Sequence, residues 1–86
     1  MHTIELLEQA QAAAAGLGYT VRQEYLGGTG GGAAEFGGKK WIFVDLALSI
    51  PEQLDQVLDA LRAEATIQSA LLSPALRRVL NIRRAA

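Results

Sequence analysis

The apolar run from Trp41 to Val44 constrains the fold most, because it leaves a strand with no polar face. Strands at a half-exposed sheet alternate apolar and polar residues, whereas continuously apolar strands are typical of the sheet centre. We therefore predict a central strand over Lys39 to Leu48, covered on at least one face by helices. The preceding Gly37-Gly38 pair predicts a hairpin to a short strand over Ala33 to Phe36.

A capping-box pattern follows this strand and marks the start of a helix. Ser49 and Glu52 have the capping-box spacing, and Pro51 falls in the first turn, where its missing N–H group costs little. Apolar residues then recur at helical spacing: Leu54, Val57, Leu58, Leu61 and Ala65. The pattern predicts a helix with one apolar stripe.

The remaining elements are a first helix, a first strand and a last helix. Helical spacing predicts a helix from Ile4 to about Ala15, and alternating side chains predict a half-buried strand from Tyr19 to Leu26. The last helix begins at Ser73-Pro74 by the same capping argument. Residues 66–72 fit either a loop or a frayed helix.

The element order predicts an α+β fold with the sequence α-β-β-β-α-α, in one domain over residues 1–86. Short links between the strands favour a small antiparallel sheet, as in a meander, with the helices packed on one face.

The amino-acid composition limits which metal sites, disulfides and cofactors we expect. The chain has no cysteine and one histidine, so we expect no disulfide, no zinc site and no cofactor. It carries neither a basic, apolar leader nor an apolar run long enough for a bilayer, so the expected location is the cytoplasm.

Few residues offer catalysis, and we predict that the protein is not an enzyme. The sole histidine, His2, lies at the terminus, and Asp55 and Asp59 lie opposite the leucine stripe, as a solvated pair would. Asp45 interrupts the central strand. There it either faces solvent near the strand end or caps a neighbouring backbone.

The glycine-rich segment from Gly27 to Gly32 formally contains a G-x-G-x-x-A match after a strand. A dinucleotide site requires a helix to follow, and here a second glycine pair and another strand follow instead. The P-loop pattern fails as well, because Ala33 stands where its first glycine is required. We therefore predict a flexible connection between strands, which a partner would order.

Charge is distributed unevenly along the chain. Residues 1–64 hold four basic and nine acidic residues, a net charge of −5, whereas the remainder holds four arginines and no acid, a net charge of +4. These arginines are the candidate binding residues: Arg77, Arg78, Arg83 and Arg84. They could contact phosphates or the acidic part of the same or another copy. Nucleic acid is the less favoured partner, because interleaved aromatics and an overall basic charge are missing.

The segments Gly18 to Arg22, Trp41 to Asp45 and Leu48 to Leu54 resemble small uncharacterised bacterial proteins. The same order resembles the front half of the phage-repressor-cleaving and radiation-response zinc metallopeptidases, over roughly residues 4–64. In that family the corresponding helix carries H-E-x-x-H, which binds zinc and activates water. Here that helix, from Gln53 to Glu64, contains no histidine, so the resemblance implies a non-catalytic relative and transfers no zinc ligand.

The functional expectation is a small, non-catalytic interaction or accessory domain that self-associates. An anion- or nucleic-acid-binding module that uses the C-terminal arginines is one alternative. A degenerate zincin-like domain that keeps a small-molecule pocket is the other.

Overall fold

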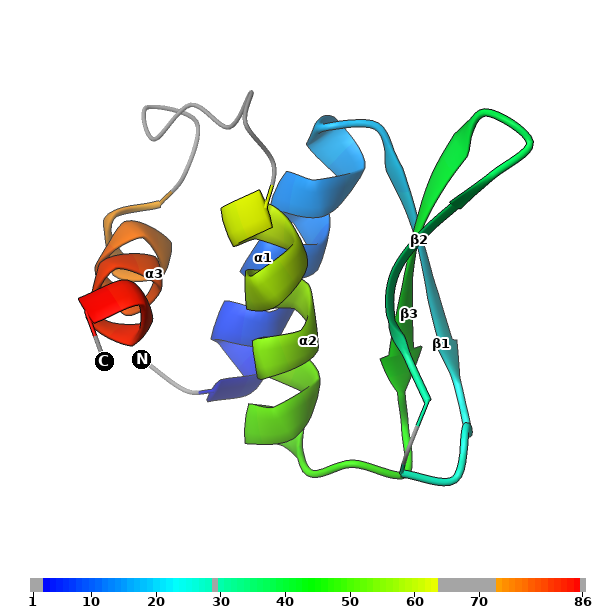
Figure 1. The fold of residues 1–86 in the computed structure, drawn as a ribbon. Helices are drawn as coiled ribbons and strands as arrows, with labels where there is room; N and C mark the ends of the chain where they lie inside the picture. Colours follow the sequence, from blue (N-terminus) through cyan, green and yellow to red (C-terminus); the bar gives the residue numbers. More distant parts are fainter. Residues whose placement is uncertain (1–2, 29, 64–72, 86) are drawn as a thin grey trace.

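The computed structural model describes residues 3–28, 30–63 and 73–85, with side chains described up to Leu80 in the last segment. The elements follow in the order α1 (Thr3–Gly16), β1 (Tyr19–Glu24), β2 (Gly32–Phe36), β3 (Lys39–Asp45), α2 (Ile50–Ala63) and α3 (Pro74–Ala85) (Figure 1). The predicted α+β class and element order are confirmed. β1 ends at Glu24 rather than Leu26, and β3 at Asp45 rather than Leu48. Residues 66–72 lie outside the described ranges.

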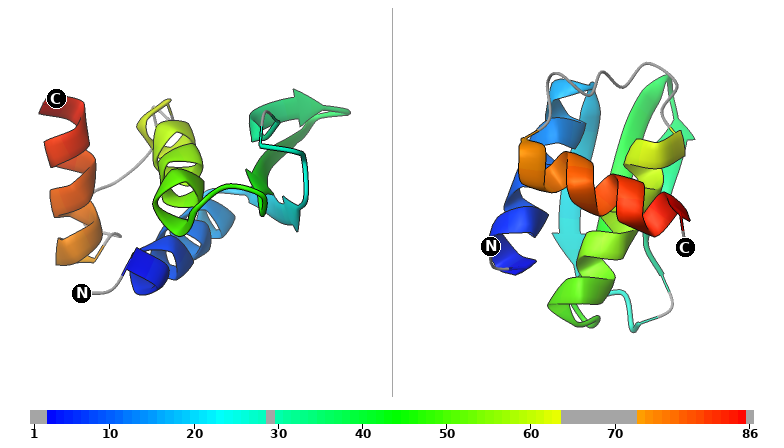
Figure 2. Two further views of the ribbon diagram at one scale, coloured as in Figure 1. Left: turned by 90° about the horizontal axis from the view of Figure 1, so that it is seen from below. Right: turned by 90° about the vertical axis from the view of Figure 1, so that its left-hand side faces the viewer.

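The described elements form three layers. The sheet is one layer, α1 and α2 pack side by side on one of its faces, and α3 packs on the far side of these helices (Figures 1 and 2). The prediction that helices cover one face of the sheet is confirmed. No described element covers the opposite face.

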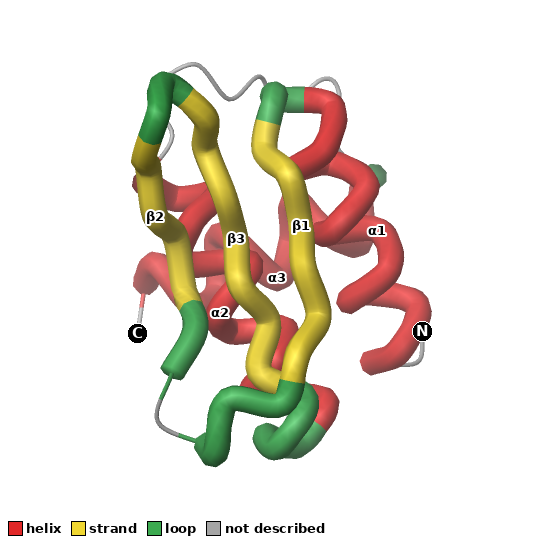
Figure 3. The backbone as a smooth tube through the Cα atoms, turned by 90° about the vertical axis from the view of Figure 1, so that its right-hand side faces the viewer, coloured by secondary structure: helices red, strands yellow, loops and turns green. Residues whose placement is uncertain are grey.

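The sheet is mixed, with strand order β1-β3-β2 (Figure 3). β2 is antiparallel to β3 and pairs Phe36 with Lys39 across the turn, as predicted. Both turn residues, Gly37 and Gly38, have positive φ, which the favoured two-residue hairpin turn requires. β1, however, is parallel to β3, with Tyr19 opposite Lys40 and Glu24 opposite Asp45, so the prediction of an all-antiparallel sheet is wrong.

The glycine-rich segment explains the parallel pairing. In a meander, β2 would follow β1 at its side, but residues 25–31 instead cross two strand spacings, about 10 Å, to the far edge of the sheet. β3 therefore lies between β1 and β2 at the centre of the sheet, and its Ile42 and Val44 side chains are fully buried. β2, with the sequence Gly-Ala-Ala-Glu-Phe, has little apolar side chain to bury and occupies an edge.

The core extends through the three layers, from the sheet to α3. α2 contributes the predicted leucine stripe up to Leu61, while Ala65 lies outside the described residues. α1 contributes the small residues Ala10 and Ala14, and α3 the inward-facing Leu76. Both alanines are fully buried. Within the described ranges, no helix combines the length and apolarity that crossing a bilayer requires.

Side-chain caps begin the second and third helices as predicted. The Ser49 N–H donates to Glu52 Oε1 at 3.1 Å, and the Glu52 N–H donates to Ser49 Oγ at 3.3 Å, which is the reciprocal capping box. At α3, the Leu76 N–H donates to Ser73 Oγ at 3.1 Å. The pKa of Glu52 is lowered by the hydrogen bonds from the Ser49 hydroxyl and the Ser49 N–H, which outweigh the desolvation of the carboxyl group.

Replacing the capping serine should weaken the fold by a modest amount. The change Ser49→Ala removes the acceptor of the Glu52 N–H, and we expect a loss of about 1 kcal/mol in the free energy of unfolding. Urea denaturation followed by circular dichroism measures this loss. Ser49→Asp, which keeps a capping oxygen, is the control and should remain close to the wild type.

Candidate functional site

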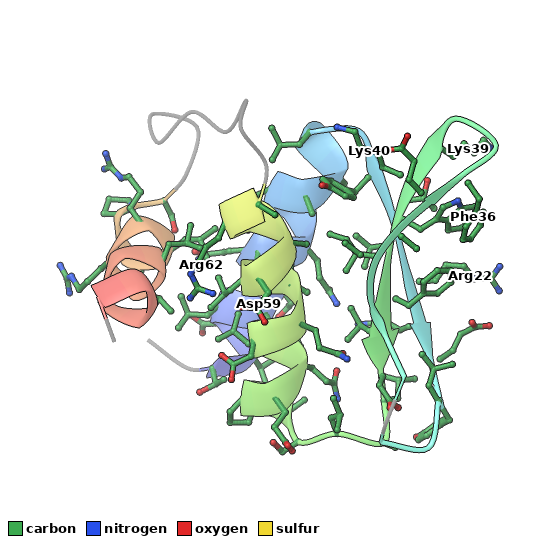
Figure 4. All side chains as sticks on the ribbon, in the orientation of Figure 1. Arg22, Phe36, Lys39, Lys40, Asp59 and Arg62 are labelled. Carbon is green, nitrogen blue, oxygen red and sulfur yellow. The ribbon has the colours of Figure 1, made fainter. Side chains whose placement is uncertain are left out.

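The face of the sheet turned away from α1 and α2, here named the open face, is the most distinctive surface of the described chain. Side chains alternate between the two sides of a strand. With the observed register, the open face therefore carries Thr20, Arg22 and Glu24 from β1, Gly32, Ala34 and Phe36 from β2, and Lys39, Trp41, Phe43 and Asp45 from β3. Asp45, at the end of β3, is fully buried and accepts hydrogen bonds from the N–H groups of Leu26 and Gly28. Figure 4 shows Arg22, Phe36 and Lys39 pointing away from the helices.

Three aromatic rings gather on the open face. The ring centroids of Trp41 and Phe43 lie 5.8 Å apart with an interplanar angle of 6°, and Phe36 lies 5.8 Å from Trp41 and 6.3 Å from Phe43. Trp41 and Phe43 are half-buried, whereas Phe36 remains 56% exposed. The Trp41 indole N–H is buried and has no hydrogen-bond acceptor among the described residues.

A shallow hollow of about 380 Å³ adjoins these rings, at the end of the sheet where the glycine-rich segment crosses. Its walls come from all three strands and from the crossing segment: Glu24, Leu26, Gly30, Gly31, Gly32, Ala33, Ala34 and Phe43. Glycine and alanine dominate this lining, so the hollow exists because the positions carry almost no side chain. The lining is chiefly apolar, with one carboxylate, that of Glu24.

Charges flank the aromatic rings. Arg22 Nη2 and Glu24 Oε1 lie 3.1 Å apart on β1, and their side chains are 53% and 44% exposed. Lys39 is exposed at the opposite end of the open face, beside Phe36. The cation of Lys39 therefore stands at one end of this surface, and the Arg22–Glu24 ion pair stands at the other.

Asp45 anchors the glycine-rich segment to the end of β3. Its carboxylate, fully buried, accepts hydrogen bonds from the N–H groups of Leu26 at 2.9 Å, Gly28 at 2.7 Å and Ala47 at 2.9 Å. Of the two sequence interpretations of Asp45, the backbone cap is confirmed and the solvent-facing position is wrong. These bonds hold Leu26 and Gly28 at the end of β3, and the flexibility of the segment stays a prediction.

Gln56 of α2 supplies a second anchor on the other side of the segment. Its Oε1 accepts from the Asp45 N–H at 2.9 Å, and its Nε2 donates to the Gly30 carbonyl at 3.0 Å. Gly31 lies directly against it: a Cβ atom there would stand 2.4 Å from Gln56 Nε2 and 2.8 Å from the Phe43 carbonyl oxygen. The segment passes so close to β3 and α2 that this position requires glycine.

The environment of Asp45 favours its charged form. Burial by itself would raise the pKa of the carboxyl group, but the N–H groups of Leu26, Ala47, Gly28 and Gly30 donate to the carboxylate and together hold the pKa below its ordinary value of 3.8. A carboxylate kept ionised and occupied by backbone donors is a structural anchor and a poor proton carrier at neutral pH.

The structure only partly places the arginines predicted as binding residues. Arg77 and Arg78 are exposed on α3, on the far side of the helices from the sheet. Arg83 and Arg84 fall within α3, but their side chains lie outside the described part. A shared arginine patch stays a prediction.

The chemistry-bearing residues weighed from the sequence form no metal site where they are described. In the described ranges no group of three or more histidine, cysteine or acidic side chains could hold a metal ion. Asp59 is exposed and pairs with Arg62 at 2.7 Å on the side of α2 away from the sheet (Figure 4), and His2 lies outside the described residues.

Comparison with family models, with curated proteins and with solved structures gives no match to this chain. The resemblance to the zinc metallopeptidases therefore stays a hypothesis.

The open face was not identified from the sequence, although a signal for it was present. Trp41 and Phe43 are two residues apart and so share one side of β3, opposite Ile42 and Val44. A two-residue turn at Gly37-Gly38 then places Phe36 on that same side. The apolar run from Trp41 to Val44 predicts a central strand covered on at least one face by helices, and by itself it does not indicate which of these residues face away from them.

Proposed function

We propose that this chain is a small, non-catalytic interaction domain of the cytoplasm that self-associates, and that the open face is its contact surface. The single observation that carries the proposal is the cluster of Phe36, Trp41 and Phe43 on a sheet face that no described element covers.

Exposed aromatic side chains support an interaction surface on physical grounds. Phenylalanine and tryptophan are enriched in interface cores, and contiguous apolar patches on soluble monomers commonly mark binding sites. A Phe36 side chain that stays 56% exposed gains free energy when a partner removes it from water, by about 25 cal/mol for each Å² of apolar surface.

The hydrogen bonds to the buried carboxylate of Asp45 support the proposal that the domain is non-catalytic. Asp45, which interrupts β3, has its oxygens occupied by backbone N–H groups and so lacks a free position for a substrate proton. The hollow is shallow and its lining has one carboxylate, which offers no acid–base pair. The small-molecule and arginine alternatives remain hypotheses that no described contact favours.

Self-association is tested by sedimentation velocity of the wild-type protein across about 5 to 500 µM. We expect the sedimentation coefficient to rise with concentration from that of a monomer toward that of a dimer. The control replaces Arg77 and Arg78 of α3 with alanine and should associate as the wild type does. A protein that stays monomeric throughout this range would remove the self-association proposal.

A further inference from the structure

We infer that β2 is a pairing edge, along which a second copy of this chain adds its own β2 antiparallel, so that the two three-stranded sheets become one. This inference rests on the proposed self-association and places the contact at the margin of the open face that β2 forms. Backbone groups of β2 make the contact, and the sheet continues from one copy into the other.

The outer side of β2 carries unpaired backbone groups. β2 lies at one edge of the sheet, and β3 pairs only with its inner side (Figure 3). Residues that flank a two-residue hairpin turn exchange hydrogen bonds, and bonded and non-bonded pairs then alternate along both strands. Phe36, Ala34 and Gly32 therefore bond to β3 through their backbone groups. The N–H and C=O groups of Ala33 and Glu35 point the opposite way, and no hydrogen bond from the described part of the chain reaches them.

The chemistry of this edge identifies an extended strand as its occupant. Ala33 and Glu35 each present one donor and one acceptor, about 7 Å apart along the strand, which is the spacing that an antiparallel strand offers in return. Both residues are exposed, so α2 does not block the approach. β2 contains no proline or lysine, and its register with β3 runs without a bulge. It therefore lacks the features with which edge strands commonly resist pairing.

Self-pairing has a register that satisfies all these groups at once. A two-fold axis perpendicular to the sheet at Ala34 makes the two β2 strands antiparallel and sets Ala33 of each copy opposite Glu35 of the other. Each such pair exchanges two N–H···O=C bonds, so the contact gains about four hydrogen bonds. No outward-facing group of Ala33 or Glu35 is then left unpaired.

Charge and backbone position disfavour the neighbouring registers. An axis at Glu35 would set the two Glu35 carboxylates directly opposite each other, and like charges in that position are destabilising. An axis at Ala33 would pair Glu35 with Gly31, which lies outside β2 and directly against Gln56 of α2. The register centred on Ala34 avoids both costs.

The size of the contact sets the expected affinity. One added pair of five-residue strands buries far less than the roughly 1,600 Å² of a standard stable interface. The dimer should therefore be weak and reversible, with a dissociation constant on the order of 100 µM. Sedimentation over the concentration range given above covers this value.

Edge pairing is tested by Glu35→Pro, with Glu35→Thr as the matched control. Proline removes the outward N–H group, which makes no bond to β3, so the variant should fold, and circular dichroism checks this. Sedimentation should show association at least about tenfold weaker for Glu35→Pro. Glu35→Thr removes the same charge but keeps the N–H group, and it should associate at least as tightly as the wild type.

The register is tested by Ala34→Cys, which introduces a single thiol because the sequence contains no cysteine. Opposite residues of a non-bonded antiparallel pair have Cα atoms about 4.5 Å apart, which is within reach of a disulfide. Mild oxidation should therefore link Ala34→Cys into a covalent dimer. Ala33→Cys is the control: its Cα atoms would lie about 8 to 9 Å apart, beyond that reach, so it should stay unlinked.

Amide hydrogen exchange followed by NMR reads the contact in the wild type itself. The N–H groups of Ala33 and Glu35 should exchange more slowly as the protein concentration rises, whereas that of Ala34, bonded to β3, should be protected at every concentration.

The possible outcomes separate this inference from the proposed self-association. Association that leaves the Ala33 and Glu35 amides unprotected, or that is equally strong in Glu35→Pro, overturns edge pairing and leaves self-association standing. Ala33→Cys linking as readily as Ala34→Cys overturns the register. A strict monomer overturns both proposals, and protection of these amides in that monomer by an added extended peptide would indicate a foreign strand instead.

Discussion

Gly31→Ala should destabilise the protein by about 3 kcal/mol, which corresponds to a fall of about 15 °C in Tm for a domain of this size. Two costs combine at this position. The backbone of Gly31 has a φ of +102°, which side chains disfavour, and the added Cβ atom would stand 2.8 Å from the carbonyl oxygen of Phe43, part of the central strand. The Gln56 amide would also be displaced from its bond to Gly30. Thermal unfolding followed by circular dichroism measures the effect.

Gly27→Ala is the control for this prediction. Gly27 also has a positive φ, +80°, but no atom lies within 4 Å of the position its Cβ would take. Gly27→Ala should therefore lower the free energy of unfolding only through the unfavourable φ, by about 1 kcal/mol. An equal loss of stability in the two variants would contradict the close approach of the segment to β3 and α2.

Asp45→Asn should lower Tm at neutral pH by about 10 °C or more. The asparagine amide replaces one acceptor oxygen by a donor group, which then faces backbone N–H groups that are donors themselves. The buried position leaves no water to accept these hydrogen bonds instead. Asp59→Asn, which removes one negative charge from an exposed site on α2, is the control and should change Tm little. A Tm close to that of the wild type in Asp45→Asn would show that the anchor is dispensable.

The pH dependence of stability follows from the same carboxylate. Because the pKa of Asp45 is lower in the folded protein than its ordinary value of 3.8, the native state favours the ionised form. This contribution is fully present above pH 3.8 and is lost as the pH falls through the lower pKa of the folded state. Urea midpoints measured from about pH 6 downward should therefore fall more steeply in the wild type than in Asp45→Asn.

Much of the fold was predictable because its signals are local. Ser49 with Glu52, and Ser73 before Pro74, mark helix starts through bonds within one turn, and Gly37-Gly38 marks a hairpin through φ values that only glycine adopts freely. These predictions depend on a few adjacent residues, and the structure confirms them.

Strand direction and the open face were not predictable in this way. The parallel pairing of β1 with β3 depends on how far the glycine-rich segment travels, and this is set by Asp45 and Gln56, far along the chain from it. The open face emerges only when β2, β3 and the helices are placed together, since Trp41 is half-buried by Phe36 and Phe43 rather than by a helix. Alternation already places Trp41 and Phe43 on one side of β3, but strand direction and the side that the helices cover depend on tertiary contacts, which composition and periodicity do not encode.

The hydrogen bonds from the glycine-rich segment to Asp45 also indicate the order in which the strands join the sheet during folding. The hairpin of β2 and β3 closes through a two-residue turn and can form within microseconds, whereas pairing Tyr19 with Lys40 closes a much longer loop. The carboxylate of Asp45 reaches its position only when β3 is complete, and only then can the N–H groups of Leu26 and Gly28 bind it. β1 should therefore be the last strand to join the sheet and the first to leave it, so that amide hydrogen exchange along β1 reports local opening while β3 reports global unfolding.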